Sequence, residues 1–396
     1  MKNSPKLFIC IEDLEISLII GHIDEQNDFK FLEKLSLSFE GTIKNKISDL
    51  DKFTSIVKKN ILLIEKKINY TFKDIIIILD IFEISFLNLC GFKKLNGTQI
   101  SKENIIYILN SLKSYINEFE ENKKILHIFN SEYLLDDKKL DNLPIGLFGD
   151  FYSQELSFNM MSTNDYNNLK QIFDKCNLKI EKVLIKSFIE SVYINHKHNI
   201  ETFFLIKINN HNSKISFFEN ASLKFEQVFN FGIDIVFSDI SKITSLKMEN
   251  VKHIMEKVNL IETLSEEENI EKEFFSDNNY KKIKKKLIYE IAFARIQEIS
   301  ELIIFKNINL KYHNKVPKKI FLDVKSQSQD KGLIKIFESV FSLNYKLDLK
   351  LVTDSSNANL VRTTNDLLQF GWKKEAIPVA LSKKSILKRF FEAFFS

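Results

Sequence analysis

Glycine is scarce in this sequence, with nine residues in 396, whereas average proteins contain roughly 7%. Phosphate-binding loops use glycine for tight turns and for close approach of the backbone, so this chain cannot form several of them. The three cysteines are widely spaced and form no CxxC motif, which predicts reduced, buried thiols in a cytosolic protein. The sequence therefore predicts neither a disulfide framework nor a set of glycine-rich phosphate loops.

Long apolar runs and one-sign charge tracts are also lacking. Ile75–Leu79, among the longest apolar runs, is far too short to span a bilayer, which needs roughly 20 residues. The apolar run Leu7–Ile11 stops at Glu12 and Asp13, so no signal peptide is expected. The 57 basic and 53 acidic residues give a net charge of +4 without a long basic tract before the C-terminal region. Nucleic-acid binding is therefore not indicated.

The hydrophobic pattern predicts an α/β protein. Residues 6–40 follow a strand–turn–strand pattern, residues 52–68 carry one apolar helical face, and residues 74–86 form a buried strand run. A polar turn at residues 209–213 then joins two apolar strands in a hairpin. This turn contains no glycine, and lysines flank it.

The usual catalytic and metal-binding patterns are missing. No GxSxG, Cys/His dyad or HExxH motif is present. His196-Lys197-His198 and His211 lack a carboxylate or cysteine at ligand spacing, which favours a solvated loop over a metal site. The acidic residues at 12–15 fall on both faces of a strand, so an exposed strand end is favoured over a catalytic pair. The sequence predicts no catalytic residue and no metal ligand.

Several short motifs in one order resemble the bacterial cell-division protein FtsA, a member of the actin-like proteins. They occur at compatible spacings over nearly the whole chain: His127, Tyr133 and Asp136 with Pro144–Gly149 (NPxGxxG); the helix at residues 164–177; Gly232–Asp234 with Ser238–Ile240 (VGGxxxTxDIA); residues 291–302 with Arg295 and Glu298 (IIxPRxEEIxEL); and Thr364–Gly371.

The resemblance implies an α/β fold of the actin/Hsp70-like (ASKHA) type, with two lobes and an FtsA-type inserted subdomain. The implied boundaries are 1–85 and 166–200 for the first lobe core, 86–165 for the inserted subdomain, 201–240 and 311–360 for the second lobe core, 241–310 for its small subdomain, 361–371 for the return to the first lobe, 372–382 for a linker, and 383–396 for a terminal helix.

All three nucleotide-binding loops of the resembled family are altered. The family's LDIGTSK, DIGGGTTD and TGGGS loops correspond to residues 9–15, 207–214 and 323–327. The metal-side aspartate becomes cysteine, glycines become charged or amide residues, and carboxylates facing a polyphosphate would repel it. The degenerate positions are Cys10, Glu12, Asp13, Lys207, Asn209, Asn210, His211, Lys214, Asp323 and Lys325. We expect no cofactor and no enzymatic activity, with ATP and magnesium bound only if main-chain contacts suffice.

Arg295 is the candidate partner-binding residue. In the resembled family, the C-terminal tail of the tubulin-like protein FtsZ docks near the corresponding helix. An arginine can hold a carboxylate of an acidic, apolar peptide by a two-pronged hydrogen bond. The alternative is an intramolecular ion pair, because the same helix carries Glu298 and Glu301. In the first case, reversing the charge of Arg295 would weaken peptide binding and leave the melting temperature nearly unchanged.

The C-terminal segment carries the pattern of an interfacial membrane helix. Apolar side chains recur at i, i+1, i+4 and i+5 behind a linker with Pro378, and basic residues lie beside them. The predicted membrane-binding residues are Lys384, Ile386, Leu387, Lys388, Arg389, Phe390, Phe391, Phe394 and Phe395. The alternative is a helix that docks back into the core.

By resemblance, the function is structural. The protein is expected to tether FtsZ to the cytoplasmic face of the bacterial inner membrane at the division site, as a peripheral protein. It is also expected to recruit later division proteins and to self-associate into filaments. The alternatives are an actin-like pilus-assembly protein that binds a membrane partner's cytoplasmic tail, and an ASKHA-type ATPase or kinase. A membrane helix of its own argues against the first, and the altered loops argue against the second.

Overall fold

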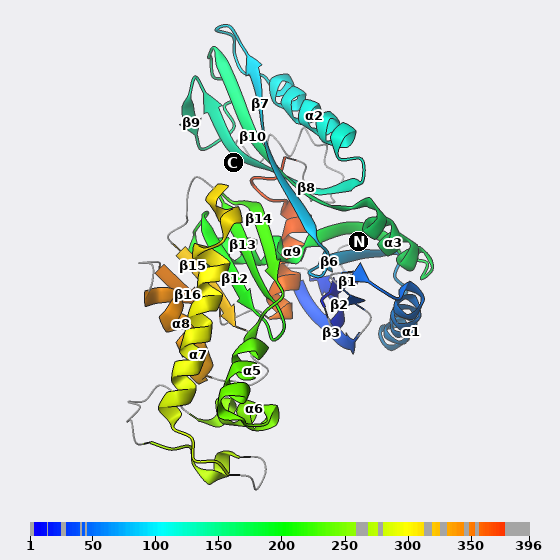
Figure 1. The fold of residues 1–396 in the computed structure, drawn as a ribbon. Helices are drawn as coiled ribbons and strands as arrows, with labels where there is room; N and C mark the ends of the chain where they lie inside the picture. The colour runs from blue at the N-terminus through cyan, green and yellow to red at the C-terminus, as the bar shows by residue number, and fades with distance from the viewer. Residues whose placement is uncertain are drawn as a thin grey trace. The chain divides into compact units, whose positions relative to one another are not determined.

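The chain divides into two compact units in the computed structural model (Figure 1). Unit 1 comprises residues 1–201, 219–224 and 355–396, and unit 2 comprises residues 202–218 and 225–354. The residues that the structure describes are 4–13, 15–24, 29–39, 42–43, 46–258, 268–275, 280–312, 319–324, 331–343, 348–352 and 356–376.

Unit 1 contains a five-stranded sheet in the order β11-β6-β1-β2-β3. Its elements are β1 (Lys6–Ile11), β2 (Glu15–Ile23), β3 (Phe29–Ser38), the short pair β4 (Thr42–Ile43) and β5 (Lys46–Ile47), α1 (Leu50–Ile68), β6 (Asp74–Leu79), α3 (Thr163–Asp174), β11 (Lys179–Ile185) and α4 (Lys186–His198). Strands β1, β6 and β11 are parallel, and β2 and β3 continue antiparallel from β1. Residues 6–40, predicted to form two strands around one turn, form three strands, because β1 and β2 are separate and antiparallel. The helix and the buried strand predicted next are α1 and β6.

Helices α1 and α3 cover one face of this sheet. Phe53, Val57 and Ile61 of α1 are buried against the apolar strand residues, as the helical periodicity predicts. Asp49 caps α1 by accepting a hydrogen bond from the Lys52 amide at 2.8 Å. The segment predicted as a solvated loop around His196 is instead the last turn of α4.

A second, antiparallel sheet follows in the order β7-β10-β8-β9, with one helix on its face (Figure 1). Its elements are β7 (Ile84–Lys94), α2 (Lys102–Phe119), β8 (Lys123–Leu135), β9 (Lys138–Leu140) and β10 (Phe151–Ser162). Helix α2 begins after its N-cap residue, Ser101. The strand run predicted over residues 74–86 is divided, because β6 ends at Leu79 and β7 belongs to this second sheet.

Unit 2 contains a five-stranded sheet in the order β14-β13-β12-β15-β16. Its strands are β12 (Phe203–Ile208), β13 (Ser213–Glu219), β14 (Ser222–Phe229), β15 (Lys319–Val324) and β16 (Asp348–Leu351). Strands β12 and β13 form the predicted antiparallel hairpin, while β12, β15 and β16 are parallel.

Helices cover one face of the unit 2 sheet and enclose its core. They are α5 (Ile233–Thr244), α6 (Met248–Lys257), α7 (Lys285–Ser300) and α8 (Lys331–Leu343), with the shorter turns η1 (Lys272–Phe274), η2 (Glu301–Phe305) and η3 (Ile308–Tyr312). Phe204, Ile206 and Ile208 point from β12 into this core. Because side chains alternate along a strand, Phe203, Leu205 and Lys207 lie on the opposite face.

The chain returns to unit 1 through α9 (Asn357–Phe370) and a packed segment at residues 372–376, which we call the strap. The Asn130 amide donates to the Lys374 carbonyl at 2.6 Å, and the Ala376 amide donates to the Ile128 carbonyl at 2.8 Å, so the strap pairs with β8. Glu375 lies 3.0 Å from Nδ1 of His127, and both side chains are buried.

The strap corrects the prediction of a linker over residues 372–382. Trp372 is 8% exposed, and its indole N–H donates to the Ala221 carbonyl at 2.7 Å. The rest of the predicted linker and the predicted helix over 383–396 lie outside the described residues. Among the helices that the structure describes, none is long and apolar enough to cross a bilayer.

Candidate functional site

Three parallel strands of unit 1 end side by side, at the edge where open α/β sheets bind their ligands. Leu79 of β6 is the register partner of both Ile11 of β1 and Ile185 of β11. The residues that directly follow these three strands are Glu12, Asp80 and Lys186. The strand register therefore brings two carboxylates and one ammonium group together.

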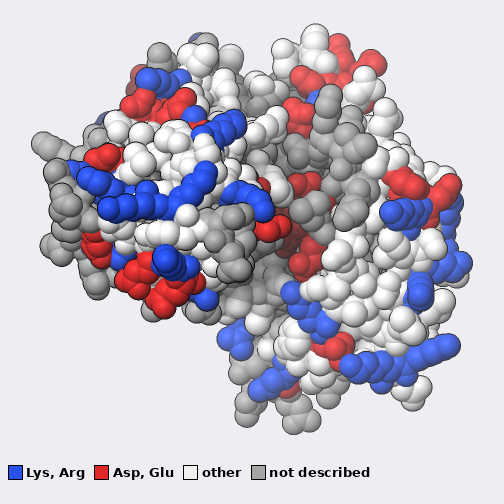
Figure 2. Space-filling model, turned by 60° about the horizontal axis from the view of Figure 1, so that its bottom comes forward, with Lys and Arg blue, Asp and Glu red and all other residues white. Residues whose placement is uncertain are grey.

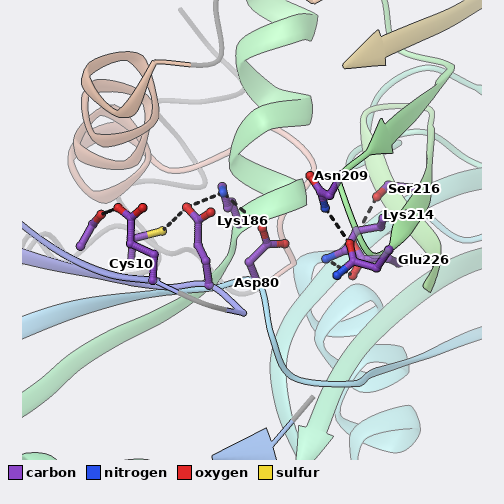
Figure 3. A network of polar contacts seen from close by, with 11 residues as sticks. Cys10, Asp80, Lys186, Asn209, Lys214, Ser216 and Glu226 are labelled. Carbon is purple, nitrogen blue, oxygen red and sulfur yellow. Dashed lines mark hydrogen bonds and ion pairs between the residues drawn. The ribbon is translucent and has the colours of Figure 1, made fainter. Parts of the chain in front are cut away.

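These three side chains form an ion triad. Nζ of Lys186 lies 2.7 Å from Oε1 of Glu12 and 3.2 Å from Oδ2 of Asp80 (Figure 3). The Lys186 side chain is only 4% exposed. Burial by itself lowers the pKa of Lys186, but Asp80 and Glu12 raise it well above its usual value. The ammonium group therefore stays charged, and the two carboxylates hold it.

Cys10 occupies the position of the metal-side aspartate in the resembled family. It is fully buried, and its Sγ lies 3.5 Å from Oε1 of Glu12. Burial raises the pKa of the Cys10 thiol, so it carries no charge. Asp13 is partly exposed beyond the triad. A neutral thiol is a poor magnesium ligand, and the only ammonium group of the triad is already paired, so these residues do not fit a magnesium-bound polyphosphate.

In unit 2, the turn between β12 and β13 is closed by its own polar groups. The Asn209 amide donates to the Asn212 carbonyl at 2.9 Å, and the Asn209 side chain donates to Oδ1 of Asn212 at 2.7 Å. His211 lies at the surface, with Nδ1 2.6 Å from Oδ2 of Asp234. The Asn209 amide, one of the groups that a phosphate loop would present to a ligand, is thus satisfied within the turn.

The N-terminus of α5 is also occupied by this turn. The amides of Ile233 and Asp234 each donate at 2.9 Å to the carbonyls of Asn209 and Asn210. Gly232 permits this approach, because a Cβ there would lie 2.2 Å from the Asn209 oxygen. Helix N-termini bind phosphate through such free amides, and here main-chain oxygens of the same unit use them.

The lysines that flank the turn belong to a buried row of charges across the unit 2 sheet. Lys207 is the register partner of Lys214 on one side and of Asp323 on the other. Nζ of Lys214 lies 3.1 Å from Oε1 of Glu226, with both side chains less than a tenth exposed (Figure 3). Ser216 donates to the other Glu226 oxygen at 3.1 Å. The row carries two positive and two negative charges, so it offers no net charge to a polyphosphate.

The described residues of the three predicted nucleotide loops therefore lie in two groups. One group, at residues 10–13, is in unit 1, and the other, at residues 207–214 with Asp323, is in unit 2. Lys325 lies outside the described residues. Sequence reasoning missed Asp80, Lys186 and Glu226. For Asp80 and Lys186 a signal existed, since each is the first polar residue after an apolar strand run. No group of three or more metal-ligating side chains was found in the described part of the chain.

A groove lies between α5 and α7 of unit 2, with a volume of about 430 Å³. Its lining consists of Asp239, Ile243, Leu287, Glu290, Ile291, Ala294, Arg295 and Glu298. Ile243 is 61% exposed and Leu287 is 40% exposed, so the groove presents apolar surface to solvent. Such a groove suits an apolar peptide segment.

Arg295 lies in this groove, but it is already paired. Its guanidinium contacts Asp239 through Nε and Glu298 through Nη1. The structure thus shows the intramolecular ion pair that the sequence left open for Arg295, with Asp239 as a further partner. Reversing its charge would remove both ion pairs and set three carboxylates together, so Arg295→Glu is now expected to lower the melting temperature.

Charged side chains of both signs are visible among the described residues on one face of the surface. On the face drawn in Figure 2, lysines and arginines lie beside aspartates and glutamates instead of forming one continuous field. Duplex nucleic acid binds to extended basic surfaces. This face does not present one.

The chain is similar to known proteins in sequence and to a solved structure in fold. No known family profile matches the chain. The cell division protein FtsA of Buchnera aphidicola subsp. Acyrthosiphon pisum (strain APS) is 22% identical over 325 residues, covering 80% of this chain and 77% of that protein. FtsA of Buchnera aphidicola subsp. Schizaphis graminum (strain Sg) is 21% identical over 394 residues, covering 94% and 92%.

Among solved structures, a chain of a PilM–PilN type IV pilus biogenesis complex is similar in fold. It has a TM-score of 0.54 at 9% identity, and the match covers 88% of each chain. At this identity the similarity concerns the fold alone. Together with the order of motifs along the sequence, these findings identify the chain as a divergent FtsA-like protein with an actin-like fold.

Proposed function

We propose that this protein is a division scaffold that tethers FtsZ to the cytoplasmic face of the inner membrane without using a nucleotide. The similarity to the two FtsA proteins supports an actin-like role in cell division. In this proposal the groove of unit 2 binds the FtsZ tail, the C-terminal segment binds the membrane, and the actin-like body self-associates and recruits later division proteins.

The observation that carries the FtsZ proposal is the exposed apolar lining of the groove between α5 and α7. Asp239 and Glu298 already balance the charge of Arg295 before a peptide carboxylate approaches its remaining N–H groups. A further carboxylate beside this paired guanidinium adds little net free energy. Apolar side chains of the peptide, packed on Ile243 and Leu287, therefore supply most of the affinity.

Leu287→Asp is expected to weaken binding of the FtsZ tail peptide at least tenfold, or about 1.4 kcal/mol. The substitution removes an apolar contact and adds a carboxylate to a lining that already contains Asp239, Glu290 and Glu298. Because Leu287 is 40% exposed, the melting temperature should change little. Fluorescence anisotropy with a labelled peptide measures the affinity.

Ile308→Asp is the matched control for this experiment. Ile308 is an exposed apolar residue of unit 2 that does not line the groove. The control should bind the peptide as the unmodified protein does. Equal binding by Leu287→Asp and the unmodified protein would exclude the groove as the docking site.

Magnesium-ATP is expected to produce neither hydrolysis nor a substantial thermal shift. Lys186 is held in the ion triad, the turn between β12 and β13 is closed by its own hydrogen bonds, and the buried row of charges in unit 2 has no net charge. Among the described residues of the three loops, this leaves no cationic group and no free helix N-terminus for the phosphates. A ligand present at 100 times its Kd stabilises a protein by about 2.7 kcal/mol, which is readily measured by thermal denaturation. Micromolar ATP binding by calorimetry would contradict this proposal.

A further inference from the structure

Lys186 carries a buried ammonium group at the edge of the unit 1 sheet where its parallel strands end. It is the first residue of α4, and its side chain is 4% exposed, whereas those of Glu12 and Asp80 are 26% and 17% exposed. The ammonium group is therefore the most deeply buried member of the triad. Two carboxylates that converge on one partly buried point repel each other unless a cation lies between them.

We infer that the Lys186 ammonium is a built-in counter-ion, which holds the carboxyl ends of β1, β6 and β11 together in place of a dissociable metal ion. The two carboxylates directly follow β1 and β6, and the ammonium directly follows β11, so the triad cross-links three chain segments. The inference concerns the stability of unit 1 and does not depend on FtsZ or membrane binding.

The surroundings of the triad agree with a counter-ion and not with an ordinary surface ion pair. Glu190, one helical turn after Lys186, adds a further negative charge near the ammonium group. Sγ of Cys10, a neutral buried thiol, lies 3.5 Å from Oε1 of Glu12, and an aspartate in its place would add yet another carboxylate for a single cation to balance. An exposed pair such as Lys175 and Asp51, 49% and 92% exposed, has no such constraint.

The test compares thermal denaturation of the full chain with that of lysine variants, with and without divalent cations. Lys186→Met should lower the unit 1 melting temperature by roughly 5–10 °C, because it leaves two carboxylates unbalanced. Lys175→Met removes an exposed pairing lysine and should lower it by less than about 2 °C. Equal stability of Lys186→Met and the unmodified protein would overturn the inference.

Two further arms separate loss of charge from loss of packing. Adding Glu12→Gln and Asp80→Asn to Lys186→Met should recover at least about half of the loss, because the unbalanced charges are removed. Magnesium or manganese chloride should raise the melting temperature of Lys186→Ala by several degrees and leave the unmodified protein unchanged within about 1 °C. No recovery in the triple variant would assign the loss to packing, and an equal magnesium response in the unmodified protein would mean that the site still takes a metal ion. Either result overturns the inference.

If Lys186→Met does not fold, the triple variant alone decides between the two explanations. With neutral amides in place of both carboxylates, it should fold and melt within roughly 5 °C of the unmodified protein. A triple variant that also fails to fold would show that the lysine is needed for packing and not as a counter-ion.

Discussion

Replacing both Phe390 and Phe394 with aspartate is expected to abolish sedimentation of the protein with anionic liposomes. The sequence predicts a helix over residues 383–396 with six large apolar side chains on one face. This segment lies outside the described residues. Each contributes part of the roughly 1.5–3 kcal/mol of full burial, and each nearby lysine or arginine adds on the order of 1 kcal/mol beside an anionic leaflet. Two aspartates on the apolar face remove the burial of two phenylalanines and add negative charges that an anionic leaflet repels.

Phe370→Asp serves as the control for membrane binding. Phe370 is 75% exposed at the end of α9, so its replacement changes a surface phenylalanine outside the predicted membrane helix. Sedimentation should be unaffected. High salt or neutral liposomes should weaken binding only in part, because the aromatic face remains. Full sedimentation after deletion of residues 383–396 would locate the anchor elsewhere.

Trp372→Ala is expected to destabilise unit 1 by about 3–5 kcal/mol, the usual cost of removing a buried tryptophan from a core. Trp372 is the only tryptophan of the chain and is almost fully buried. Its ring packs at 5.6 Å from His196 and 6.4 Å from Phe188, both of α4. The substitution leaves a cavity there and leaves the Ala221 carbonyl without its indole donor. Circular dichroism should show a melting temperature lower by roughly 10 °C.

Trp372→Phe separates the two contributions. It keeps an aromatic ring against Phe188 and His196 and removes the indole N–H with part of the ring system, so a smaller loss of about 1–2 kcal/mol is expected. Equal losses in the phenylalanine and alanine variants would assign the whole effect to the hydrogen bond. A negligible loss in the alanine variant would mean that the strap is not packed in solution.

The elements with a clear period were predictable from the sequence. The apolar face of α1 and the β12–β13 hairpin each have a pattern that local chain geometry dictates. The actin-like fold followed from the order of short motifs along the chain. The division of residues 74–86 between two sheets was not predictable, because a continuous apolar run does not reveal which partner each half has.

The charged clusters could not be assembled from the sequence. Lys186 lies 174 residues from Glu12, and they meet because β1 and β11 both pair with β6 in parallel register. Sequence spacing carries no information about that register. The strap was missed for a related reason: its stability depends on Ala221 and His127, which are distant in the chain, and its own sequence has no period. Pro378 suggested a linker, and that local signal was misleading for residues 372–376.

The strap also determines how unit 1 would carry mechanical load. A pull directed along the strap would act on its hydrogen bonds to Asn130 and Ile128, which lie across the strand direction. Those bonds are loaded in shear and must break together, with the buried contact between His127 and Glu375. Tension from a membrane-bound tail would thus reach the 13-residue strand β8, and through it the sheet that β8 forms with β10, before it reaches α9.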